Sequence, residues 1–421
     1  MAGHDSGLPP VSQAELDKAI KNHAMYSEGS VGGARAVLND RDLSDLNFRG
    51  ANLSGADFSH SLFKNANMAD SDFSSAIFFG CDLRGANLEN ADLTKADFRG
   101  AQVIGANLRG ANLNKADLRK GQVMSFAKTA KGDGPQHDGR TLFTGAYLSE
   151  ANLNGIRASD VDFTDADLSA VLLTDADLKN AKFLGANLED SDLSGAVLTN
   201  ANMNGAIITG TKFEAVERGG LDLTDTISDK SAGEQLEKSA KDLKSLLLEH
   251  VTWIETAGKK GTQLNLSGYD LRGITAFNKI PLTACRAEKA VFIGMDMSSM
   301  HLQSAHFEHS DFRDVKLHNA DMRGTHFEGS NFTRANLDGV KACPLQFGKG
   351  QIVTNMSGCS FKYASLENAD LRNVDFTNAD LRYANLNGAD LRGATFAGAN
   401  LSSVYFEDAQ IDDDALVGFI T

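Results

Sequence analysis

The sequence predicts an all-β solenoid, in which the chain winds into stacked coils. The stretch CDLRGANLENADLTKADFRG (residues 81–100) contains the same five-residue unit four times: a small residue, Asp or Asn, Leu or Phe, a polar residue, and often Gly. A period of five would scatter the Leu and Phe positions around a helix. On a continuous strand it would place Leu83 and Leu88 on opposite faces. The chain is therefore expected to turn once in every unit, always in the same sense.

Within one unit, residues two apart can share one side of a short extended segment. Ala86 and Leu88 are such a pair, and a corner is expected after each Leu or Phe, as at Arg84 and Gly85. The Ala and Leu/Phe positions then build the core, and the Asp/Asn position faces solvent. On this assignment Asp82→Ala should be nearly neutral for stability.

The repeated unit resembles the pentapeptide-repeat family, whose consensus is a small residue, Asp/Asn, Leu/Phe, a polar residue and a small or Gly residue. The match extends over most of the chain. The resemblance implies a right-handed, four-sided parallel β-helix with about 20 residues per coil. Coils that stack through backbone ladders exclude proline from most positions, and the chain has only five prolines.

Repeats on both sides of a helical segment predict two such solenoids in tandem. A large apolar residue recurs at every fifth position from Leu38 to Val123 and, apart from Ala158, from Phe143 to Phe213. The segment 231–258 has helical spacing, and the repeats resume after it. The expected parts are an N-terminal helix and cap at 1–37, a first solenoid at 38–228 with a loop at 124–142, a helical cap or linker at 229–263, and a second solenoid at 264–421 with a loop at 338–358.

Similar segments precede the two solenoids, at residues 19–43 and 247–271. The matching residues are His23 with His250, Tyr26 with Trp253, and Glu28 with Glu255. The first coil of a solenoid leaves open backbone groups, so an N-terminal α-helical cap is expected on each. The matched residues are interpreted as packing residues of these caps, and the alternative is a pair of binding sites.

Composition disfavours direct nucleic-acid binding and membrane insertion. The chain has 41 Lys and Arg against 56 Asp and Glu, a formal net charge of −15, which opposes binding through phosphates. No signal-peptide pattern stands near Met1, and no apolar run approaches the about 20 residues that cross a bilayer. Cys81 and Cys359 fall at the small inward position, which is typical of reduced core thiols, so a cytoplasmic protein is expected.

The sequence carries no pattern typical of an enzyme. It has no Gly-rich phosphate loop, no nucleophile elbow and no Cys-pair zinc spacing, so no catalysis, cofactor or metal is expected. His306 and His326 leave one alternative open. Their spacing of four repeats puts them one coil apart, each just before a core Phe, and they could bind a transition metal between two coils. No carboxylate or thiol of the same strip clearly completes such a site.

The favoured function is a non-catalytic, rigid scaffold that presents flat faces and loops to a protein partner. The resemblance implies one alternative, because some family members imitate DNA with an acidic rod, protect DNA gyrase and confer quinolone resistance. A DNA mimic needs negative charge along the rod axis. The best axial stripe consists of Asp57, Asp97 and Asp117, which are spaced by whole coil lengths and interrupted by Ile77.

The polar loop adds further candidates for partner binding, because loops matter in the gyrase-protecting members of the family. These residues are Lys128, Lys131, His137 and Arg140. The gyrase protectors are single solenoids that dimerise through a C-terminal element, whereas this chain is expected to have two solenoids with N-terminal caps. This difference favours the scaffold over the DNA mimic.

Overall fold

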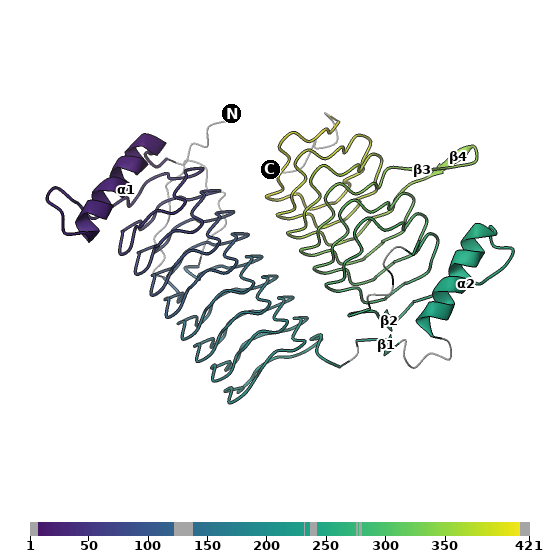
Figure 1. Cartoon of the computed structure of the whole chain (residues 1–421), viewed down its shortest axis with the longest axis horizontal. Helices are drawn as coiled ribbons and strands as arrows, with labels where there is room; N and C mark the ends of the chain where they lie inside the picture. Colours follow the sequence, from purple (N-terminus) through teal and green to yellow (C-terminus); the bar gives the residue numbers. More distant parts are fainter. Residues whose placement is uncertain are drawn as a thin grey trace. The chain divides into compact units, whose positions relative to one another are not determined.

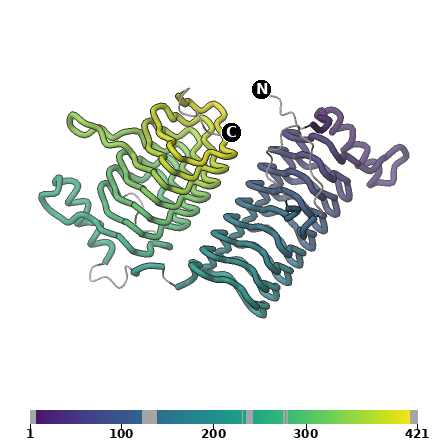
Figure 2. Tube along the Cα trace, turned by 180° about the vertical axis from the view of Figure 1, so that it is seen from behind, coloured from purple at the N-terminus to yellow at the C-terminus, as the bar shows by residue number. Residues whose placement is uncertain are grey.

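The computed structural model describes residues 7–121, 138–230, 232–235, 242–274, 277 and 280–412. The chain divides into two compact units, Met1–Asp229 and Lys230–Thr421. Within each unit the chain winds into a stack of coils, which Figures 1 and 2 show from opposite sides. The five-residue period therefore builds a β-helix, as the sequence predicts.

Parallel β-bridges join each coil to the next. In the first unit Asn47, Asn67, Asn87 and Asn107 form one column of bridged residues, each four repeats after the one before. Three more columns run along the same stack, through Asp57, Asp42 and Asn52, so each coil has four sides. The second unit repeats this arrangement with columns that contain Arg286, Val291, Asp296 and His301. The bridged residue is the Asp/Asn position of the repeat.

Backbone hydrogen bonds explain why every repeat must turn. Phe58 N–H donates to Ile77 O, and Ile77 N–H donates to Ala56 O, both at 2.9 Å. The corner then closes with a bond from Ser61 N–H to Phe58 O at 3.1 Å. His60, just before Ser61, has a φ of 64°, a conformation that costs energy for most residues but little for Gly, Asn or Asp. This cost accounts for the frequent Gly at the fifth position.

The core of each unit is a narrow column of Ala, Leu and Phe side chains. Ala56 and Phe58 are both fully buried, as the two-residue spacing predicts. Phe78 stacks between Phe58 and Phe98, with ring centroids 5.3 and 5.0 Å away. The second unit has an equivalent ladder, Phe292, Phe312, Phe332 and Phe361, with centroid separations of 4.6 to 5.0 Å.

The first stack is interrupted without losing its register. Gly121 N–H donates to Gly139 O at 2.8 Å, and Gln102 pairs with Leu142, two coil lengths further along the sequence. Leu142 also pairs with Asp162 in the next coil, so it belongs to the ladder and not to the expected loop 124–142. The apolar Leu142 at the bridged position hid this boundary, because the repeat normally has Asp or Asn there.

The second stack carries a β-hairpin where the sequence suggested an irregular loop. Strand β3 (Leu345–Phe347) pairs antiparallel with β4 (Gly350–Ile352), and the hairpin projects from the coils (Figure 1). The expected loop 338–358 is too long, because Val340, Ala342 and Met356 are fully buried in the core of the stack.

Two helices are present among the described residues. Helix α1 (Gln13–Ser27) starts at a capping box in which Glu15 Oε2 accepts from Ser12 N–H at 2.8 Å. Its Gln13 side chain docks on the first coils, since it both donates to and accepts from the backbone of Asn47 at 2.9 Å.

No helix of the described ranges is long and apolar enough to cross a membrane.

Helix α2 (Leu243–Glu255) is shorter than the predicted helical segment 231–258. The Asp242 side chain accepts from Ser245 N–H at 2.8 Å and so fixes the start of the helix. Upstream, β1 (Glu234–Gln235) pairs in parallel with β2 (Tyr269–Asp270). This pairing places Glu234 and Gln235, which fall within the predicted segment, in a strand and not in a helix.

Candidate partner-binding surface

The acidic stripe expected from the sequence lies in one column of the first unit. Bridges join Asp57 to Ile77, Ile77 to Asp97, Asp97 to Asp117, and Asp117 to Arg157. Ile77 interrupts the stripe, as the spacing predicted. Arg157 takes the next place because the chain returns to the ladder only after the excursion that begins beyond Gly121.

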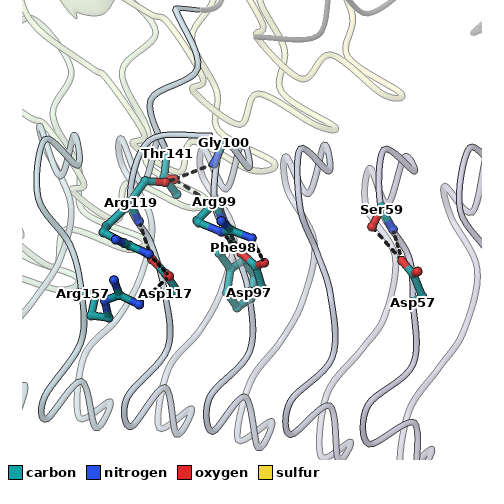
Figure 3. Close-up of polar contacts among 10 residues, drawn as sticks. All are labelled: Asp57, Ser59, Asp97, Phe98, Arg99, Gly100, Asp117, Arg119, Thr141 and Arg157. Carbon is teal, nitrogen blue, oxygen red and sulfur yellow. Dashed lines mark hydrogen bonds and ion pairs between the residues drawn. The ribbon is translucent and has the colours of Figure 1, made fainter. Parts of the chain in front are cut away.

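Arginines compensate two of the three carboxylates (Figure 3). Arg99 donates from Nε to Asp97 Oδ1 at 2.9 Å and from Nη2 to Oδ2 at 2.6 Å. Arg119 donates to Asp117 in the same way, from Nε to Oδ1 at 2.9 Å and from Nη2 to Oδ2 at 2.7 Å. Such two-point pairs hold the guanidinium flat against the carboxylate and neutralise it.

Asp117 contacts a second cation, since Arg157 Nη1 lies 3.2 Å from its Oδ2. Burial alone would raise the pKa of Asp117, but the hydrogen bonds from Arg119 and the charges of Arg119 and Arg157 outweigh it and hold that pKa below its usual range. Asp57 is held differently, by the N–H and hydroxyl of Ser59 at 3.0 and 2.7 Å. The negative charges of Asp97 and Asp117 are therefore compensated by arginines, whereas Asp57 is hydrogen-bonded to Ser59.

The same pairing recurs wherever Asp and Arg flank a core residue. The geometry follows from the coil: the bridged Asp and the residue two positions later both point outward on the same side. Sequence analysis missed this signal, although Asp-x-Arg is visible in the sequence. In the described part of the chain, nine triplets form the two-point pair: 82/84, 97/99, 117/119, 270/272, 311/313, 321/323, 370/372, 380/382 and 390/392.

The Asp/Asn position makes contacts that the expectation of a nearly neutral Asp82→Ala did not include, because the side chain does not simply face solvent. The Asp82 side chain is only 10% exposed, and its Oδ2 lies 2.6 Å from Arg84 and 3.7 Å from Lys64. Its Oδ1 also accepts from the Arg84 backbone N–H at 3.2 Å. The alanine variant would remove the acceptor of two cations and of a turn N–H.

The loop candidates are only partly visible. Lys128, Lys131 and His137 lie outside the described residues, and Arg140 pairs with Asp138 at 3.0 Å.

Thr141, which sequence analysis did not select, anchors the foot of this loop and is fully buried. Its Oγ1 accepts from Gly100 N–H at 2.9 Å and lies 3.1 Å from the carbonyls of Phe98 and Arg119 (Figure 3). The chain therefore returns to the stack beside the coils that contain Arg99 and Arg119.

The first cap motif has its histidine in the contact between helix and coils. His23 is fully buried, its Nδ1 accepts from Ala36 N–H and its Nε2 donates to Ser54 O, both at 3.0 Å. Burial lowers the pKa of His23, partly offset by the bond to Ser54. Tyr26 contacts the imidazole at a centroid distance of 5.9 Å, and Glu28 is exposed at the C-cap of α1.

The second cap motif repeats this contact. His250 is fully buried and its Nδ1 accepts from Leu264 N–H at 3.0 Å. Trp253 stacks on the imidazole at 5.8 Å and 13°, and Glu255 is exposed at the end of α2. Burial lowers the pKa of His250, partly offset by the backbone of Thr283. Both imidazoles are buried in the helix–coil contact, which favours packing over ligand binding, although His250 Nε2 lacks the counterpart of the bond that His23 Nε2 makes to Ser54 O.

His306 and His326 lie one coil apart, as their spacing predicted, but their rings stack face to face. The centroids are 4.8 Å apart and the planes differ by 5°. His306 Nδ1 lies 2.9 Å from Glu308 Oε1. Across the described part of the chain, no group of three or more His, Cys, Asp or Glu is arranged to hold a metal ion.

Comparison with known proteins agrees with the repeat architecture. The pattern described as pentapeptide repeats matches more than half of the chain, at residues 42–80, 81–119, 141–180, 172–210, 310–343, 354–378 and 375–411. The chain belongs to the pentapeptide-repeat family. No curated protein matches it.

Three solved structures are among those to which this pentapeptide-repeat protein is similar. QnrB1, a plasmid-mediated fluoroquinolone resistance protein, is 23% identical over 46% of this chain and 91% of its own, with a TM-score of 0.31. HetL from the cyanobacterium Nostoc is 20% identical over 91% of this chain and 95% of its own, with a TM-score of 0.12. Rfr23 from the cyanobacterium Cyanothece is 33% identical over 30% and 91%, with a TM-score of 0.19.

Replacing Asp117, which pairs with two arginines, should affect stability more than replacing Asp57, whose side chain is bonded to Ser59. Asp117→Asn leaves Arg119 and Arg157 without their shared anion, whereas Asp57→Asn keeps an oxygen for Ser59. We expect Asp117→Asn to lower the free energy of unfolding by about 1 kcal/mol more than Asp57→Asn, because the arginine pairs are partly exposed. Urea titration of the two variants measures the difference, and equal effects would contradict the arginine compensation.

The first unit should lose stability as the pH falls below the ordinary histidine pKa. The lowered pKa of His23 means that the folded state keeps it neutral, so the unfolded chain binds more protons below the ordinary pKa of 6.5. The loss is at most about 1.4 kcal/mol per pH unit. The comparison is thermal unfolding at pH 7.5 and 5.5 for the wild type and His23→Gln. A pH effect of the same size in both proteins would rule out this role of His23.

Proposed function

We propose that this pentapeptide-repeat protein consists of two β-helices in tandem, each closed at its N-terminal end by a helical cap. The duplicated contact supports this arrangement, since His23 and His250 each accept a backbone N–H from the segment that leads into a stack. A cap covers the open edge of a first coil and so prevents edge-to-edge association.

If the arrangement is correct, residues 1–228 and 229–421 should fold separately. The circular dichroism spectra of the two fragments should add up to that of the whole chain, and each should unfold cooperatively. A fragment that is soluble only in the presence of the other would refute two independent β-helices.

We propose further that the protein is a non-catalytic scaffold that binds another protein through its faces and projections. The observation that carries this proposal is the compensated surface: nine Asp-x-Arg pairs of the described coils fix each other's side chains by hydrogen bonds. Ordered, internally neutralised side chains lose little entropy on association, which suits a recognition surface. The candidate elements are the Asp57–Asp117 column, the loop bearing Lys128, Lys131, His137 and Arg140, and the hairpin β3–β4.

One feature supports the DNA mimic as the second candidate. In the first-unit coils after Thr141, several bridged aspartates have Thr, Ser or Lys two positions later in place of Arg, as at Asp162, Asp167, Asp177, Asp192 and Asp222. Lysines one coil later lie near two of them, at 3.5 Å from Asp162 and 3.7 Å from Asp192. Negative charge is therefore compensated less closely here than on the Asp57–Asp117 column, and a mimic would use these coils.

Salt distinguishes the two candidates. The whole chain, immobilised, would capture partners from its own cells at about 0.1 M and about 0.5 M salt, where a DNA mimic should release its partner because many ion pairs are screened together. For the scaffold we expect a defined complex that survives the higher salt and is lost when the loop or the hairpin is deleted. Salt-sensitive capture of topoisomerase subunits, together with altered gyrase supercoiling by the purified protein, would replace the scaffold with the mimic.

A further inference from the structure

The β3–β4 hairpin is a regular element with a tight turn. Leu345 is opposite Ile352, Gln346 opposite Gln351, and Phe347 opposite Gly350, which leaves only Gly348 and Lys349 in the turn. Gly348 has a φ of 61°, as the first central residue of such a two-residue turn requires. The tip therefore has a defined shape before any partner binds.

The base of the hairpin is seated on a glycine of the coil. A Cβ added at Gly324 would lie 3.1 Å from Leu345 Cβ and 3.2 Å from Ile352 Cβ. A side chain at this position would push both strands outward. The absence of a side chain at Gly324 thus lets the hairpin lie close to the coil, and this contact fixes the direction in which it projects.

The hairpin has one polar and one apolar face. Gln346 and Gln351 share the polar face and approach each other at 3.5 Å. Leu345, Ile352 and Phe347 share the other face by the two-residue alternation of strands. Leu345 and Ile352 are half-buried on the coil, but Phe347 lies beyond the seat and is 72% exposed. Gly350, opposite Phe347, offers no side chain to cover the ring.

The hairpin segment itself carries positive but no negative charge. Residues 339–366 contain Lys341, Lys349 and Lys362 but no Asp or Glu, whereas the whole chain has a formal net charge of −15. The ladder places Lys341 between Asp321 and Asp370, so the charge at the tip is that of Lys349, which is exposed and stands in the turn two residues after Phe347. The tip thus joins an uncovered aromatic side chain to positive charge.

We propose that Phe347 is an anchor that inserts into an apolar pocket of a protein partner whose rim carries carboxylates. An aromatic side chain on a preorganised support is typical of the residues that dominate binding energy at interfaces. Lys349 pairs with the acidic rim and orients the tip. A single-stranded nucleic acid would also offer stacking surfaces, but the acidic charge of the chain opposes its phosphates. This inference rests on the proposed scaffold function and names the contact that it uses.

The first test is photo-crosslinking in the protein's own cells, with the full-length chain carrying p-benzoylphenylalanine at position 347. The matched control carries the same group at position 351, on the polar face of the same hairpin. We expect one protein adduct from position 347, none from position 351, and an attachment site flanked by Asp or Glu. Equal adducts from both positions, no adduct, or an adduct that nuclease removes would overturn the proposal.

The second test measures affinity for the crosslinked protein, purified. Phe347→Ala should weaken binding about 10- to 100-fold, and Gln351→Ala less than about 3-fold. Lys349→Glu should weaken binding more at low than at high salt. All three hairpin positions are exposed, and unchanged circular dichroism would show that the fold is intact. If a partner binds the chain but Phe347→Ala leaves its affinity unchanged, the anchor is wrong while the scaffold function stands.

Discussion

The backbone ladder between successive coils is the constraint on which the rest of the structure depends. It places a residue next to the one four repeats later, at a strand spacing of about 4.8 Å. Like residues therefore lie on like residues, and the ladder that stacks Phe58, Phe78 and Phe98 in the core would equally stack carboxylates on the surface. A column of uncompensated aspartates would repel itself along its whole length. The Asp-x-Arg pair resolves this conflict within one coil.

Insertions must respect the same ladder, and both do. The first adds the length of one whole coil between bridged partners, so Asp117 pairs with Arg157, and the second is shorter, so His326 pairs with Asn355. Each leaves at a corner and returns to the register it left. Thr141 and Gly324 hold the insertions to the coils in different ways. The buried Thr141 hydroxyl lies within hydrogen-bond distance of three backbone groups where the first insertion ends. At Gly324 the absence of a side chain lets the base of the hairpin in the second insertion lie close to the coil. An interruption that kept no phase would turn the Ala and Phe positions outward.

The sequence predicted the β-helix because its period is local and strong, so the burial of Ala56 and Phe58 follows from spacing alone. The surface was harder to predict. From the sequence alone, Asp97 is interpreted as an uncompensated negative charge. In the folded coil Arg99 pairs with it, because the corner sets the direction of both side chains. Likewise Leu142 looks like a loop residue, and only its pairing with Gln102 places it in the ladder. The hairpin tip Phe-Gly-Lys-Gly is a readable turn signal, but the close approach of the hairpin base to Gly324 appears only in the folded coil.

The coils of the second unit and the β3–β4 hairpin would contribute differently to binding a partner. The coils are already ordered by the ladder, so a partner that docks on them need not supply energy to fix their backbone. Where Asp and Arg side chains form two-point pairs, as in six triplets of the second unit, little uncompensated charge is left to drive association. Affinity must then come from sites where burial is still incomplete, and Phe347 is the most exposed Phe or Tyr ring among the described residues, at 72%. Rigidity and exposure thus lie in different parts of the second unit, with the coils holding the hairpin in position and Phe347 supplying the apolar surface that binding would bury.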